Sequence, residues 1–187
     1  MAEGLDRHSR RTASIHYLLP DPEEEEERRL AAVRRFDTLD TLPDPILDLI
    51  ATSAADLLAA PVAAISVVDR NRIWFKARHG LDLHHTSHAP GLCASAIMHR
   101  TPLMLPDALQ DSRAKSNPLV TGDLGIRFYL GIPLRTQDGF NIGTLCVMDH
   151  KPRTATPKQI ASLVNLASVV MDHLELVISK QSANGCL

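Results

Sequence analysis

Cysteines are few in this sequence and long apolar runs are absent. Its three cysteines are far apart and odd in number, which argues against a disulfide framework and fits a reducing compartment. The longest largely apolar run, residues 57–68, is well short of the roughly 20 residues that span a bilayer. The first residues lack the apolar segment of a secretory signal. We therefore expect a cytoplasmic protein with no membrane partner.

Excess positive charge and the common catalytic motifs are also absent. The net charge of -2 removes the simplest case for binding nucleic acid. The sequence contains no glycine-rich phosphate loop, no His-Glu-x-x-His motif and no nucleophile elbow. We therefore expect a protein that is not an enzyme, has no nucleic-acid partner and requires no cofactor.

The charge is concentrated near the N-terminus. Residues 1–27 carry eight acidic side chains against three arginines, and five of the acids form an unbroken, self-repelling run. The chain as a whole is typical of a globular protein, because 44% of its 187 residues are hydrophobic. We predict a flexible extension at residues 1–22, one domain at 23–181 and a flexible tail at 182–187.

The first half of the domain is predicted to contain two helices followed by a hairpin. Apolar residues recur at three-residue steps over residues 24–39, as expected for one face of a helix. Asp44 and Pro45 have the features of an N-cap and a first helical residue, so a second helix begins there. Two β-branched or alternating runs, residues 62–68 and 73–78, then predict a pair of strands.

The second half is predicted to contain a short helix, three more strands and a long final helix. Alanine-rich residues 90–100 suit a short buried helix, and residues 106–126 are typical of a long, partly helical surface loop that lines a site. Asp138 and Gly139 indicate a hairpin turn. The remaining elements are strands at 102–105, 128–134 and 140–148 and a helix of about 24 residues that begins at Thr156.

Together these elements predict an α+β domain with a mainly antiparallel sheet. Several short segments also occur in a recognisable order: Trp74-Phe-Lys, Gly80-Leu-Asp, Cys93-Ala, Ala96-Ile, Pro106-Asp-Ala, Asn117-Pro-Leu-Val-Thr-Gly, Arg127-Phe-Tyr, Gly131-Ile-Pro-Leu and Gly143-Thr-Leu-Cys-Val-Met-Asp. This set resembles the GAF domain superfamily, most closely the GAF sensor domains of bacterial histidine kinases and diguanylate cyclases.

The resemblance implies a central antiparallel sheet of about six strands. It implies terminal helices packed on one face of the sheet and a ligand pocket on the other. It also implies a sensory role in bacterial signalling, and it does not fix the ligand, because fold alone is a weak warrant for function.

The final helix carries two apolar stripes, although a helix that packs on one sheet needs only one. We therefore expect a homodimer through residues 24–38 and 157–180, and the alternative is one wide core face. The first stripe has heptad spacing and consists of Ile160, Val164, Ala167, Met171, Leu174 and Ile178. The second stripe consists of Leu163, Leu166, Val170 and Val177.

Arg127 is the main candidate for ligand contact, because its charge lies at the entrance of an apolar strand. Such a guanidinium needs an anionic ligand or an acidic partner, and an ion pair with Asp107 is the alternative. Trp74 and Tyr129 offer apolar faces with one polar atom each. We predict a pocket between the sheet and residues 81–126 that binds an anionic or strongly polar small molecule.

Cys93 is included among the ligand-binding candidates, as a possible attachment point or redox thiol. The alternative is a small packed residue. We expect Cys93 not to be catalytic, because the sequence supplies no cationic partner unless His99 folds back toward it. Free methionine sulfoxide reductases are enzymes with the GAF fold that use clustered cysteines, and the positions of Cys146 and Cys186 do not indicate such a cluster.

Three histidines, His84, His85 and His88, are weak candidates for a metal site, because imidazole is a common ligand. Their spacing is not that of a zinc finger, and a polar loop is the alternative. The predicted function is a non-catalytic sensory module that binds a small molecule and signals through a dimer helix to a separate effector. The alternatives are a redox-active GAF enzyme and a ligand-free protein-interaction scaffold.

Overall fold

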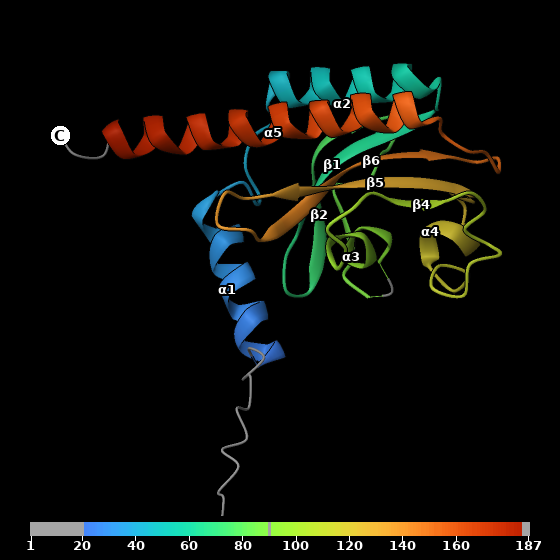
Figure 1. Ribbon diagram of the computed structural model, residues 1–187, viewed down its shortest axis with the longest axis horizontal. Coiled ribbons are helices and arrows are strands. Elements are labelled where there is room, and N and C mark those ends of the chain that lie inside the picture. Colours follow the sequence, from blue (N-terminus) through green and yellow to red (C-terminus); the bar gives the residue numbers. More distant parts are fainter. Residues whose placement is uncertain (1–20, 90, 185–187) are drawn as a thin grey trace, which may run out of the picture.

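The computed structural model describes residues 21–89 and 91–184, which form a central sheet with helices on both sides (Figure 1). The elements are α1 (Pro22–Arg35), α2 (Pro45–Leu58), β1 (Val62–Val68), β2 (Arg72–His79), β3 (His85–Ser87), α3 (Leu92–Ile97), β4 (Leu103–Leu105), α4 (Pro118–Thr121), β5 (Phe128–Arg135), β6 (Asn141–Asp149) and α5 (Pro157–Asn184). The six strands are ordered β3-β2-β1-β6-β5-β4, and every neighbouring pair is antiparallel. The predicted α+β fold is confirmed.

The short helix α4 lies within the predicted, partly helical loop at 106–126. Two elements differ from the prediction. The sixth strand, β3, lies in the histidine-containing stretch that was expected to be a loop. The final helix has 28 residues and extends into the predicted tail at 182–187. Most of the predicted extension at 1–22, and Cys186, lie outside the described residues.

Both N-terminal helices begin with an N-cap aspartate followed by proline. Asp21 Oδ1 accepts a hydrogen bond from the backbone N–H of Glu23 at 3.0 Å. Asp44 Oδ1 accepts from the N–H groups of Ile46 and Leu47 at 3.0 and 3.3 Å, which confirms the predicted cap of the second helix. A side-chain acceptor at this position satisfies N–H groups that have no partner within the helix.

The two faces of the sheet are covered by different helices. In Figure 1, α2 and α5 lie side by side over one face, and α3 and α4 lie on the opposite side. Along β1, Ala63, Ile65 and Val67 belong to the core beneath the long helices. Val62 and Ala64 belong to the core on the α3 side. Every residue of β1 is therefore buried, as expected for a central strand with cover on both faces.

Helix α1 uses its apolar face within the domain. Leu30, Val33 and Phe36 are all nearly inaccessible to solvent, and Val33 and Phe36 join the core shared with α2 and α5. Residues 24–38 therefore do not present the exposed apolar stripe that their predicted place in a dimer seam requires.

Helix α5 buries parts of both predicted stripes. Its core-facing residues are Leu163, Ala167, Val170, Met171 and Leu174. Its large exposed hydrophobic residues are instead Val164, Val169 and Leu176. The six-residue heptad seam is thus not a separate exposed surface, because Ala167, Met171 and Leu174 already pack against the sheet.

Helix α5 also has the length and composition of a membrane span. The stretch Pro157–Gln181 has a mean hydropathy of 1.5, and by length and composition alone it is long and apolar enough to cross a membrane. The sequence prediction considered only the run at 57–68 and missed this helix. Leu163 and Val170 on its inner side are fully buried in the domain core, so the apolar composition has a packing role that needs no bilayer.

Arg29 joins α1 to the end of β1. Its Nη1 donates a 2.7 Å hydrogen bond to the carbonyl oxygen of Val68, and its Nε and Nη2 donate to the carboxylate of Glu26 at 2.8 and 2.7 Å. The residue is only 8% exposed. A buried guanidinium with these partners stabilises the position of α1 against the sheet.

Arg29→Ala is expected to lower the free energy of unfolding by about 2 kcal/mol, because it removes a buried charge-assisted hydrogen bond. The matched control is Arg28→Ala, whose pair with Glu24 is more than half exposed, and its expected cost is below about 1 kcal/mol. Urea unfolding followed by circular dichroism measures both. Equal losses would contradict the anchoring role of Arg29.

Candidate functional site

A buried group of thiols and hydroxyls lies beneath α3. Cys93 on α3 and Cys146 on β6 are buried neighbours whose thiols influence each other's acidity, and Cys146 Sγ donates a 3.5 Å hydrogen bond to the carbonyl oxygen of Ala64. Ser66 and Thr144 lie beside them, with their hydroxyl oxygens 2.9 Å apart. Tyr129 completes this set, which we call the thiol cluster.

The thiol cluster shifts the acidity of its members in opposite directions. Hydrogen bonding to Cys146 lowers the pKa of Cys93, against the opposing effect of burial. The same hydrogen bond and burial raise the pKa of Cys146. Burial raises the pKa of Tyr129. No cation contributes to the lowered pKa of Cys93, whose largest cause is a neighbouring thiol that the sequence analysis did not consider. That Cys93 is not catalytic stays a prediction.

Tyr129 occupies its place because of a glycine two residues along β5. A Cβ atom added at Gly131 would lie 2.3 Å from the Tyr129 hydroxyl oxygen, so only glycine leaves room for the ring. The ring is fully buried in the core on the α3 side. The centre of this face, where the ligand pocket was predicted, therefore holds packed side chains.

Arg127 pairs with Asp107 at the start of β5. Its Nε and Nη2 donate to the two carboxylate oxygens of Asp107 at 2.7 and 2.6 Å. The Arg127 guanidinium lowers the pKa of Asp107. The ion-pair alternative is thus confirmed, and the pair fastens the segment after β4 to β5. Contact of Arg127 or Asp107 with a ligand stays a prediction.

Trp74 lies away from the other four candidates. It pairs across the sheet with Val67, whose side chain faces the long helices, whereas Tyr129 and Cys93 face α3. The structure therefore brings Cys93 together with Tyr129, pairs Arg127 with Asp107, and places Trp74 in a third location. The predicted five-residue pocket is not assembled as one site.

Trp74 lines a hollow of about 400 Å³ at the edge of β2. We call it the β2 hollow. Strand β3 pairs with residues 72–74 of β2, and the Phe75 N–H donates a 2.8 Å hydrogen bond to the carbonyl oxygen of His84, so β2 lies at the sheet edge only beyond Phe75. The segment between α1 and α2 covers the hollow. The lining residues are Asp40, Thr41, Leu42, Pro43, Asp48, Trp74, Phe75, Lys76, Arg78 and His84.

Hydrogen bonds hold the covering segment against β2. Lys76 Nζ donates to Thr41 Oγ1 and to the carbonyl oxygen of Leu42, each at 2.6 Å. Arg72 forms a two-pronged ion pair with Asp40. Burial lowers the pKa of the Lys76 ammonium. These contacts place a basic strand beneath a loop that contributes carboxylate, hydroxyl and carbonyl acceptors.

Two N–H groups in the β2 hollow have no acceptor. Trp74 Nε1 and Arg78 Nη1 are both buried, and neither has a hydrogen-bond partner. Sequence reasoning identified Trp74 and missed Arg78. The available signal was an arginine at the end of the segment Ile73-Trp-Phe-Lys-Ala-Arg, which carries the same conflict between charge and burial that was recognised at Arg127.

The three candidate histidines differ in their surroundings. The rings of His84 and His85 lie 6.2 and 6.4 Å from the Trp74 ring, centroid to centroid. His88 contributes its backbone N–H to the carbonyl oxygen of Asn71. Within residues 21–89 and 91–184, no group of three or more His, Cys, Asp or Glu side chains is arranged to hold a metal ion.

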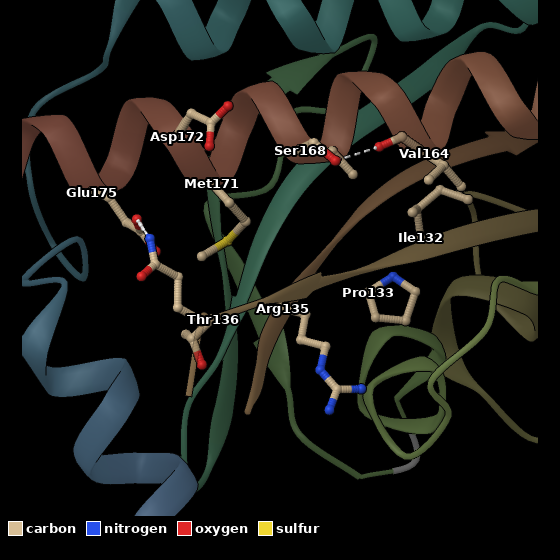
Figure 2. Close-up of a pocket in the computed structure, with 11 residues that line it drawn as sticks. Ile132, Pro133, Arg135, Thr136, Val164, Ser168, Met171, Asp172 and Glu175 are labelled. Carbon is tan, nitrogen blue, oxygen red and sulfur yellow. Dashed lines mark hydrogen bonds between the residues drawn. The ribbon is translucent and has the colours of Figure 1, made fainter. Parts of the chain in front are cut away.

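A second hollow, of about 280 Å³, lies between α5 and the end of β5 (Figure 2). Val164 and Met171 point into it from α5, while the Arg135 side chain points away from the helix. Gln137 donates a 2.6 Å hydrogen bond to Glu175 at its rim. This hollow is an open groove along α5, and Asp172 and Glu175 contribute carboxylates to its lining.

Comparisons with known proteins identify the family. Residues 43–176 match the GAF domain family. The chain is 37% identical over 161 residues to a cyclic di-GMP phosphodiesterase of Pseudomonas aeruginosa. That match covers 86% of this chain and 27% of the relative, so the chain spans only about a quarter of the relative's length.

Two solved structures have a similar fold. The GAF domain of an Acinetobacter phosphoenolpyruvate-protein phosphotransferase has a TM-score of 0.59 at 21% identity, covering 86% of this chain and 98% of that chain. A type II free methionine-R-sulfoxide reductase from Thermoplasma acidophilum has a TM-score of 0.57 at 15% identity, covering 68% and 88%. The family match spans most of the chain and agrees with the six-stranded sheet and its two-sided cover. The chain belongs to the GAF domain family.

Proposed function

We propose that this GAF domain is a non-catalytic sensory module that binds a small polar or anionic molecule and signals through α5. The observation that carries the proposal is the connection between the β2 hollow and α5. Asp44 follows the segment that covers the hollow, caps α2, and accepts a 2.8 Å hydrogen bond from His173 on α5. A displacement of the covering segment therefore acts directly on the output helix.

The shape of α5 suits an output element. It packs on the sheet through one face and continues beyond the sheet toward the C-terminal side in Figure 1. A helix that is anchored at one end and projects at the other transmits rotation or displacement to whatever it contacts. The similarity to a cyclic di-GMP phosphodiesterase that is much longer than this chain supports an effector elsewhere as the recipient.

The proposal includes a homodimer formed through α2 and α5. Ile46 and Leu49 on α2 are 51% and 66% exposed, and Val169 on α5 is 48% exposed. A shallow groove between the two helices is lined by Leu57, Leu166 and Val169 among others. This arrangement replaces the predicted seam of residues 24–38 and 157–180. The apolar face of α1 and three of the six heptad residues of α5 are buried in the core and cannot contact a second copy. A second copy of the same helix pair provides a complementary apolar surface.

A redox-active GAF protein is the second candidate function, and the thiol cluster is the observation that favours it. No local pattern in the sequence indicated that Cys93 and Cys146 are neighbours. In this alternative, the two thiols form a disulfide while methionine sulfoxide becomes methionine and water leaves, and an external dithiol restores them. Complete burial of both cysteines argues against access of the substrate.

Leu49→Glu together with Val169→Glu is expected to convert a dimer into a monomer without lowering the melting temperature, because both side chains are exposed within one chain. Native mass spectrometry and sedimentation velocity at tens of micromolar measure the subunit count. The matched control is Met98→Glu, which introduces the same charge at a 79% exposed site on the other side of the sheet. A monomeric parent, or an unchanged dimer in the double variant, would overturn this interface.

Alkylation of Cys93 by iodoacetamide in the folded protein is expected to be at least tenfold slower than alkylation of free cysteine, despite its lowered pKa, because burial blocks access. Peptide mapping separates Cys93 from Cys186, and unfolding in urea serves as the control that restores reactivity. Rapid alkylation at Cys93, or loss of 2 Da from the protein on treatment with methionine sulfoxide, would support the redox alternative instead.

A further inference from the structure

We propose that the β2 hollow binds the oxyanion group, carboxylate or phosphate, of a small molecule through Arg78 and Trp74. This inference names the ligand class and rests on the proposed sensory function. It places the ligand at the free edge of β2, under the segment between α1 and α2, and not on the α3 face of the sheet.

The first argument is the presence of two donors without acceptors in one hollow. Among the residues that the structure describes, five buried side-chain nitrogen or oxygen atoms have no hydrogen-bond partner. Two of the five are N–H donors, Trp74 Nε1 and Arg78 Nη1, and both residues line the β2 hollow. A buried donor without an acceptor raises the free energy of the folded protein. A ligand oxygen that accepts a hydrogen bond from it removes that cost, which favours binding.

The second argument is the balance of charge around the hollow. The charge of Arg72 is matched by Asp40, with which it forms its ion pair. The nearby carboxylates of Asp44 and Asp48 act to raise the pKa of the Lys76 ammonium, against the larger lowering caused by burial. The three cations Arg72, Lys76 and Arg78 are balanced by the carboxylates of Asp40, Asp44 and Asp48. Arg78 forms no ion pair with any of them within the described residues, so its guanidinium is free to pair with an anionic ligand. A guanidinium also matches the planar geometry of a carboxylate or phosphate edge.

The third argument is size and shape. A hollow of about 400 Å³ falls within the range of small-molecule sites. The Trp74 ring forms an apolar wall, and the Arg72 guanidinium lies 5.4 Å from its centroid. Trp74 lies opposite Val67 and Arg78 opposite Ala64, so the two side chains leave β2 on different faces and reach the hollow from either side of the sheet edge. The hollow therefore combines one flat apolar surface with an unpaired guanidinium, which is suited to a compact metabolite that carries one anionic group.

The covering segment is built to respond to such a ligand. Asp37 and Asp40 adopt left-handed backbone conformations, with φ of 43° and 55°, which non-glycine residues rarely occupy. The segment is held over the hollow by Lys76 and Arg72 and leads into Asp44, which contacts His173 on α5. A ligand that competes for Lys76 or orders this turn changes the contact with α5.

Fluorescence provides a direct test, because Trp74 is the single tryptophan of the chain. Inorganic phosphate and, separately, citrate are titrated against the protein at constant ionic strength, with sodium chloride as the reference. We expect a saturable change in Trp74 emission. Arg78→Gln is expected to weaken the response at least tenfold, since it removes a charge-assisted hydrogen bond.

Two control variants assign the effect to the hollow. Arg34→Gln removes an exposed arginine on α1 and is expected to leave the titration unchanged. Arg127→Met tests the rival site predicted at Arg127 and Asp107, and an unchanged titration in this variant assigns the response to the β2 hollow. Melting curves of each variant, with and without phosphate, give a second readout that does not depend on tryptophan emission.

The inference is overturned if neither anion gives a saturable response in the parent, or if Arg78→Gln binds as tightly as the parent. A response lost in Arg127→Met and retained in Arg78→Gln would move the site to the α3 side. If native mass spectrometry finds a retained small molecule while phosphate and citrate do not bind, the ligand class is wrong and the proposed function survives. If the protein binds no small molecule of any class, both this inference and the proposed function are wrong.

Discussion

The structure depends on one constraint: the sheet is covered on both faces, so every polar group carried into the interior needs a partner. Arg29 finds the Val68 carbonyl and Glu26, and Ser66 finds Thr144 across the β1–β6 pair. Arg127 finds Asp107 at the edge of the same interior. Each of these contacts satisfies a charge or hydroxyl and also fixes the position of a neighbouring segment.

The places where the constraint is not met are informative. At the edge of β2, the chain leaves two N–H donors buried and unpartnered beneath a loop in unfavourable backbone conformations. An unsatisfied donor and local strain are both costs that a stable fold tends to avoid. Their occurrence in one hollow that connects through Asp44 to α5 is the reason for placing the ligand site there.

The same constraint explains what the sequence could and could not predict. The cap at Asp44, the central strands and the Arg127–Asp107 alternative were accessible, because they follow from local chemistry or from a conflict between charge and burial. The location of Trp74 was not, since it depends on a register shift between β1 and β2. One extra residue at that shift, Lys76, breaks the simple alternation of faces on which period-two reasoning relies.

The thiol cluster and the helix surfaces were hidden for a related reason. Cys93 and Cys146 meet only because α3 packs over β6, a long-range contact that no local spacing encodes. The stripes of α5 were recognised, but their division between core and surface depends on the angle at which the helix crosses the sheet. Val164 and Met171 belong to the same predicted stripe, yet one is exposed and the other is buried.

The most direct test of the account is the indole N–H resonance of Trp74, observed by proton–nitrogen NMR in the uniformly labelled protein. The chain has one tryptophan, so its indole gives a single signal. The account predicts that inorganic phosphate shifts this signal downfield as Nε1 gains an acceptor, and that Arg78→Gln suppresses the shift. An indole signal that phosphate leaves in place in the parent protein would contradict the account.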